Sequence, residues 1–229
     1  LLVNEPPKAH DDPELQQLKG TIREFEEELV WAYTGVSVKN VHPLHLGFYK
    51  DSHDFPNRER DVEPVLQQLH AIKPTTISVI MDPMNVGPTN THYKVLQTIA
   101  KAIEAWNEEA DLSQLKIMGY RNVWSTFALE EANTIVPVSL NNFAVIEKAF
   151  RDSYLTQVEA EFPNPNFDGT FSELSESIWV RQLKDVQLLL GKDYFYENRH
   201  PLIRATHGLI FLKQMNVEEF LHVADQMKR

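Results

Sequence analysis

The chain has 229 residues, of which 42% are hydrophobic, and this is enough for one core of ordinary size. Because there is no cysteine, disulfides and thiolate metal sites are excluded, and any metal must be held by His, Asp or Glu. A net charge of -11 argues against a nucleic-acid binder, and no apolar run approaches the roughly 20 residues of a membrane span. We expect a cytoplasmic protein that binds neither nucleic acid nor membrane.

The beginning of the chain predicts an extended arm followed by a helix. Residues 1–17 contain three prolines among several charges, which is typical of an arm or loop. From Leu18 to Tyr33 apolar residues recur every three or four positions, so we predict an amphipathic helix that ends at Gly35. We therefore divide the chain into an arm, 1–17, and one α/β domain, 18–229.

Within this domain, predicted strands alternate with predicted helices. The strand candidates are Val41–Phe48, Thr76–Met81, Leu115–Tyr120 and Thr134–Val138. The helix candidates are Val62–Ile72, Thr91–Asn107, Asn141–Glu161, Ser172–Leu190 and a last one from Val217. The alternation predicts a Rossmann-like, mostly parallel sheet with helices on both faces, followed by a mainly helical C-terminal part.

The segment after the strand Thr76–Met81 lies where a ligand site is expected, because ligands of open α/β sheets bind beyond the carboxyl ends of the strands. Asp82 follows this strand directly, and His92 stands in the first turn of the next helix. A neutral imidazole there can bind a divalent metal, although a His in this place more often only helps to cap the helix. Asp82 can orient or bind the metal, although Asp-Pro after a strand is usually turn chemistry.

Four parts of the chain resemble, in order and spacing, blocks of the PIG-L/LmbE family of zinc-dependent deacetylases. They are Ile22–Glu26, Val41–Tyr49, Pro88–Leu96, and the pair Tyr120–Trp124 with Val136–Ser139. The chain is most similar to the deacetylase-like C-terminal region attached to some bacterial glucosamine-6-phosphate deaminases. The resemblance runs from about Leu18 to Gln157. It implies an LmbE-like fold and the hydrolysis of an amide bond in an amino sugar or related N-acyl compound.

The resemblance also implies a zinc ion, or another divalent metal, with His92 as one ligand and Asp82 as a candidate second one. The family's first block is a His-Pro-Asp-Asp turn after the first strand, which supplies two zinc ligands and the general base, and this sequence lacks it. Ala9–Glu14 is a scrambled version with no apolar strand before it, so we do not take it as the metal block. We expect the remaining ligands upstream of Leu1.

Three further residues are implicated by the resemblance. Arg23 is expected to clamp a phosphate or carboxylate of the substrate, or else to pair with a neighbouring glutamate on its own helix. Many members of the family carry histidines where this chain has Thr89 and Tyr154. Their hydroxyls can still donate a hydrogen bond to a developing oxyanion or orient a group in the site, but neither is a cation.

These observations lead to two hypotheses. The first is a zinc-dependent N-deacetylase-type domain of amino-sugar metabolism. The second is a degenerate, non-catalytic domain that serves as a sensor or partner of a glucosamine-6-phosphate deaminase, as the missing block, Thr89 and Tyr154 suggest. Expected partners are a small amino sugar or related amide, and either further copies of the chain or an attached deaminase domain.

Overall fold

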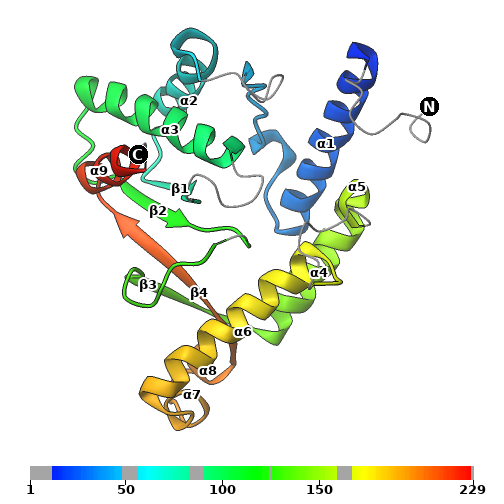
Figure 1. Cartoon of the computed structure of the whole chain (residues 1–229), viewed down its shortest axis with the longest axis vertical. Helices are drawn as coiled ribbons and strands as arrows, with labels where there is room; N and C mark the ends of the chain where they lie inside the picture. The colour runs from blue at the N-terminus through cyan, green and yellow to red at the C-terminus, as the bar shows by residue number, and fades with distance from the viewer. Residues whose placement is uncertain (1–11, 48–55, 83–89, 124, 159–166, 228–229) are drawn as a thin grey trace. The chain divides into compact units, whose positions relative to one another are not determined.

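The computed structural model describes residues 12–47, 56–82, 90–123, 125–158 and 167–227. The chain divides into two compact units (Figure 1). The first, here called the helical unit, consists of Leu1–Pro43 with Ala144–Glu161, and the second, the sheet unit, of Leu44–Phe143 with Phe162–Arg229. The predicted boundary after residue 17 coincides with no limit of either unit. None of the helices in the described ranges combines the length and the apolarity that a membrane span requires.

The helical unit is built on α1, Pro13–Tyr33, which begins earlier than predicted. The side chain of Asp12 accepts a hydrogen bond from the Glu14 N–H, and a proline occupies the first helical position, where its missing N–H costs nothing. The prediction of an extended arm is therefore wrong for residues 13–17. In the structure, Asp12 of the scrambled Ala9–Glu14 motif is the N-cap residue of α1.

Shorter elements complete the helical unit. They are η1 (Val38–Asn40), the greater part of α4 (Leu140–Ser153) and α5 (Leu155–Val158). The strand predicted at Val41–Phe48 is wrong over its described part, 41–47, which has no strand. Pro43 lacks an N–H to donate, and His45 has a φ of 50°, which a β-strand does not accommodate.

The sheet unit contains the four strands formed by the described residues, in the order β1-β2-β4-β3. Their bounds are β1 Thr76–Ile80, β2 Lys116–Tyr120, β3 Thr134–Ser139 and β4 Thr206–Met215. The mixed α/β class is confirmed, and so is one parallel unit, because β1 and β2 are parallel and α3 connects them. The prediction of a mostly parallel sheet is wrong for these residues, since β4 is antiparallel to both β2 and β3.

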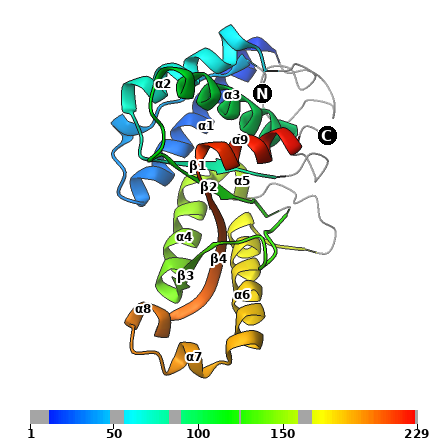
Figure 2. The ribbon, with the colours of Figure 1, turned by 90° about the vertical axis from the view of Figure 1, so that its left-hand side faces the viewer.

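Helices pack around this sheet (Figures 1 and 2). Their bounds are η3 Arg58–Val62, α2 Glu63–Ile72, α3 Asn90–Glu109, α6 Phe171–Leu190, α7 Asp193–Tyr196, α8 Pro201–Arg204 and α9 Val217–Gln226. α3 contacts β1, α2 and α9, while α6 packs against β4. The core between them includes Leu96, Ile103, Ile117 and Phe220, all fully buried.

Candidate functional site

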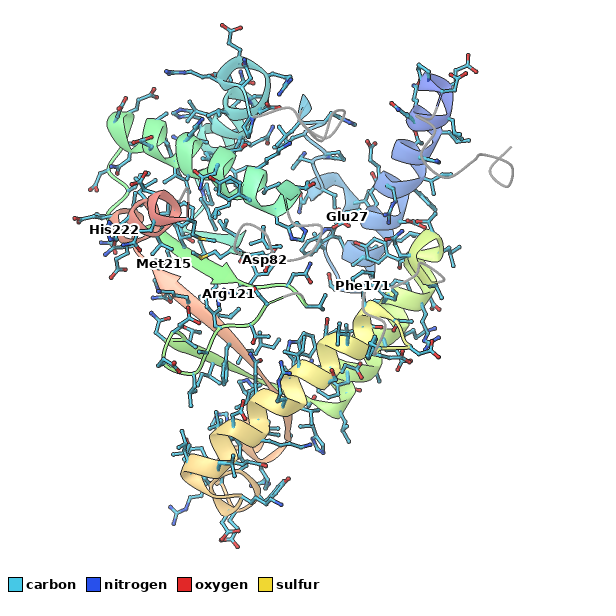
Figure 3. All side chains as sticks on the ribbon, viewed as in Figure 1. Glu27, Asp82, Arg121, Phe171, Met215 and His222 are labelled. Atoms are coloured by element: carbon cyan, nitrogen blue, oxygen red, sulfur yellow. The ribbon has the colours of Figure 1, made fainter. Side chains whose placement is uncertain are left out.

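Asp82 lies two residues beyond the end of β1, at the carboxyl end of the parallel pair (Figure 3). The ladder continues one residue past the strand, because the Met81 N–H donates to the Tyr120 carbonyl at 2.8 Å. The next residue leaves the ladder, and its side chain turns into the protein, where it is completely buried. A buried carboxylate needs several hydrogen-bond donors to offset the loss of water.

One of these donors is His92, in the first turn of α3. Its Nδ1 lies 2.8 Å from Asp82 Oδ2, while 29% of the imidazole side chain remains exposed. The sequence placed both residues at this end of the strand, and the structure joins them as a pair. Because a carboxylate can only accept, Nδ1 is the nitrogen that donates, and in a neutral imidazole Nε2 then carries the lone pair.

The other oxygen of Asp82 is held by the segment that follows β2. Oδ1 accepts the backbone N–H of Asn122 at 2.9 Å and the hydroxyl of Ser125 at 3.3 Å. Neither the Asn122 N–H nor the Ser125 hydroxyl was predicted from the sequence as a partner of Asp82. Ser125 resembles any loop serine, and a backbone N–H carries no sequence signal at all.

Arg121 closes the same segment into a turn, which we call the Arg121–Glu131 turn after its two ends. Its guanidinium donates to the Thr126 carbonyl at 2.9 Å and to both carboxylate oxygens of Glu131 at 3.2 Å. It also lies over the ring of Phe127, 4.3 Å from the centroid. In Figure 3 Arg121 lies at the end of β2, as Asp82 does at the end of β1. Arg121 thus makes four contacts with described residues of this turn.

The donor chemistry of this site fits a metal ligand in part. A His whose second nitrogen donates to a carboxylate is the usual arrangement behind a zinc-bound imidazole, and His92 with Asp82 has it. Zinc takes three or four protein ligands, however, and no group of three His, Cys, Asp or Glu side chains converges anywhere in the described ranges. At this site the described residues therefore offer His92 as a nitrogen ligand, together with Asp82, the carboxylate that orients it.

The helical unit contains two of the other predicted site residues. Arg23 is half exposed and lies 3.6 Å from the carboxylate of Glu26, so the ion pair considered as its alternative role is present. The Tyr154 hydroxyl donates to Glu27, and burial together with this hydrogen bond raises the pKa of Tyr154. The Arg23 ion pair stays within α1, whereas Tyr154 connects the segment after α4 to α1, and the roles of both side chains toward a substrate stay predictions. Thr89 lies outside the described residues.

A groove of about 690 Å³ lies at the other edge of the sheet. It is lined by residues at the end of α3, in the connection to β2 and at the start of α9, among them Asp111, Asn216 and Glu218. Because β1 and β2 end at the opposite edge, the groove is separate from the Asp82–His92 pair.

Comparison with known proteins supplies one relative. Over 133 residues, 56% of this chain, the sequence is 31% identical to a curated protein of Bacteroides thetaiotaomicron named "Putative glucosamine-6-phosphate deaminase-like protein". The match spans 20% of that protein's length. No family model matches the chain. No solved structure matches it either. The chain is thus similar to a minor part of a much longer deaminase-like protein.

Proposed function

We propose that the sheet unit belongs to a zinc-dependent N-deacetylase-type domain that acts on an amino sugar or a related N-acyl compound, with His92 Nε2 as one metal ligand. The observation that carries the proposal is the 2.8 Å hydrogen bond between His92 Nδ1 and the buried Asp82. In a neutral imidazole it leaves the lone pair on Nε2, and the partly exposed His92 side chain lies at the carboxyl ends of the parallel strands, where ligands of such sheets bind.

The chemistry of amide hydrolysis explains what each residue contributes. When bound, the metal polarises the amide carbonyl and lowers the pKa of a water molecule. His92 would bind it, and Asp82 would fix the orientation of the imidazole ring. The remaining ligands and the base that takes the proton would come from residues outside the described ranges.

The relative supports the class of substrate. Its name refers to a deaminase of glucosamine 6-phosphate, and it shares 31% identity with this chain over the matched residues. A domain that removes an acyl group from an N-acylated amino sugar would produce a free amine of the kind such a deaminase acts on. The proposal therefore places the domain in amino-sugar metabolism, with N-acetylglucosamine and its 6-phosphate as the first substrates to test.

The test is zinc retention by the full-length protein, including the residues upstream of Leu1 that are expected to supply the remaining ligands, measured by mass spectrometry after equilibration with zinc and dialysis. We expect bound zinc in the unchanged protein and a loss of at least about tenfold in affinity in His92→Ala, since one ligand is removed. The matched control is His222→Ala, which removes an exposed imidazole on α9 that hydrogen-bonds Gln226. Equal retention by both variants, or none by the unchanged protein, would contradict the proposal.

A second candidate function is a non-catalytic sensor or partner domain for an amino-sugar deaminase. It is favoured by the lack of any group of three His, Asp or Glu ligands in the described ranges and by the engagement of Tyr154 with Glu27. Here we expect glucosamine 6-phosphate or its N-acetyl form to raise the melting temperature of the full chain without release of acetate. Acetate release that depends on His92 would instead establish the deacetylase.

A further inference from the structure

We propose that two copies of the chain associate through an exposed apolar patch at the end of α6, around a twofold axis that passes through the patch. This surface, which we call the Leu188–Leu202 patch, is formed by six residues of α6, α7 and α8, each of them 49–85% exposed. They are Leu188, Leu189, Leu190, Tyr194, Tyr196 and Leu202. The proposal involves neither the Asp82–His92 pair nor a metal.

The six residues belong to neighbouring elements of the sheet unit. α6 ends before Gly191, whose φ of 80° directs the chain out of the helix, and α7 follows two residues later. α7 contacts both α6 and α8, and α8 contacts β3 (Figures 1 and 2). Phe195 of α7 is buried in the core, which leaves Tyr194 and Tyr196 on either side of it at the surface. The exposed apolar side chains therefore gather at one end of this unit.

The packing of α6 does not explain the most exposed of these residues. The buried side of the helix includes Ile178 and Val186. Leu188 lies on a different side, in line with Arg181 and Lys184, which are exposed as expected for the polar side of a surface helix. A leucine that is 85% exposed at such a position has no packing role among the described residues. Its apolar surface is therefore available for a contact with another molecule.

The area of the Leu188–Leu202 patch is close to what a dimer requires. At these exposures the six residues present on the order of 700 Å² of surface, more than the roughly 300–600 Å² of the largest apolar patch on a typical monomer. A standard interface buries about 800 Å² on each partner, with an apolar centre and a polar rim. Single exposed leucines are ordinary, whereas a cluster of this size marks a contact site.

The charge around the patch favours a second copy as the occupant. The whole chain has a net charge of -11, so that two copies repel each other over most of their surfaces. The segment 188–205, in contrast, contains three basic and two acidic residues. A twofold axis repeats every contact, and exposed neighbours of opposite charge, such as Lys192 and Asp193, can then pair twice across it. Repulsion between two copies is thus small at this patch.

The first test is the oligomeric state of the full chain, measured by light scattering during size-exclusion chromatography at micromolar concentrations. We expect a dimer of the unchanged protein. Leu188→Glu and Leu202→Glu should each weaken the dimer by at least about tenfold, because a carboxylate is then buried in the contact. The control Ile72→Glu adds the same charge at a residue of α2 that is 59% exposed, and it should leave the dimer unchanged.

Three outcomes of this test would overturn the proposal. A monomeric unchanged protein would leave the patch to a different partner, such as another domain of a longer chain. An equal weakening by all three substitutions would show that association does not depend on the patch. Assemblies larger than a dimer would contradict the closed twofold contact. Circular dichroism of each variant confirms that it is folded.

The second test is cross-linking, which the absence of cysteine from the chain makes specific. Leu188→Cys, Tyr194→Cys and Leu202→Cys each provide a single thiol in the patch, and Ile72→Cys provides one outside it. Because residues near a twofold axis lie opposite their own copies, we expect a short bis-maleimide to join two chains at one or more of the three patch positions. Linkage at all three positions that is no more efficient than in Ile72→Cys would overturn the proposal.

Discussion

Glu26 in α1 and Thr156 in α5 are joined by two hydrogen bonds although 130 residues of sequence separate them. One carboxylate oxygen accepts the Thr156 N–H and the other accepts its hydroxyl, each at 2.7 Å. Glu26 is buried, whereas Leu18 and Phe25 of the predicted apolar stripe are 51% and 59% exposed. The residue that anchors α1 is thus a charged one.

Replacing this carboxylate should destabilise the protein. In Glu26→Ala the N–H and the hydroxyl of Thr156 lose their acceptor, and each such hydrogen bond contributes about 0.5–1.5 kcal/mol net. We expect the free energy of unfolding in urea, followed by circular dichroism, to fall by about 2 kcal/mol. Glu28→Ala, on the same helix, is the control and should change it by less than about 0.5 kcal/mol. Equal effects of the two substitutions would refute this account.

Asp61 should make the free energy of unfolding depend on pH in the acidic range. Burial alone would raise the pKa of its carboxyl, but hydrogen bonds from Arg60 and from the backbone N–H groups of Asn57 and Gly47 outweigh it and hold the pKa below its usual value. The unfolded chain therefore takes up a proton first as the pH falls. The stabilisation is present above the unfolded pKa of about 3.9 and is lost as the pH falls through the folded value.

The comparison of the unchanged protein with Asp61→Asn measures this effect. At pH 7 the variant should be less stable by about 1.5–3 kcal/mol, the usual value of hydrogen bonds to a charged group. The difference should shrink as the pH falls below about 4, because protonation of Asp61 in the unfolded chain, and at still lower pH in the folded protein, removes the advantage of the charged carboxylate. Asp185→Asn, at an exposed position of α6, should show no such trend. A difference that is constant down to pH 3 would contradict the prediction.

Two glycines should respond to alanine with opposite signs. A Cβ at Gly119, in β2, would overlap Met81 Sδ in the core, so that we expect a loss of about 1–3 kcal/mol. At Gly20, within α1, an added Cβ meets nothing within 4 Å. Gly20→Ala should therefore stabilise the protein by about 0.5–1 kcal/mol, because alanine favours the helix. The melting temperatures of the two variants test this prediction. A higher melting temperature for Gly119→Ala would contradict the expected overlap with Met81.

Local patterns were enough to predict part of the fold and of the site. The apolar run Thr76–Met81 and the helix from Thr91 are confirmed within one or two residues as β1 and α3. Because a strand and the helix after it fix where their junction lies, the sequence also predicted that Asp82 and His92 share one end of the sheet. Their hydrogen bond depends on side-chain geometry that spacing does not give.

The missed parts depend on contacts between distant residues. No element was predicted for Thr206–Met215, which forms β4, because this strand is specified by its pairing with β2 and β3. The register joins Ile117 to Met215 and Thr134 to Leu212, pairs that no local window contains. The burial of Glu26 likewise could not be predicted from local sequence, because its partner Thr156 lies in another part of the chain.

The late position of β4 bears on how the protein acquires its fold during synthesis. A ribosome releases β1, β2 and β3 first, and β2 and β3 then wait with unpaired backbone groups for the strand that is inserted between them. Such edges invite pairing with other chains. A nascent chain stalled before residue 206 should therefore recruit chaperones or aggregate, and the sheet closes only after Met215 has left the exit tunnel.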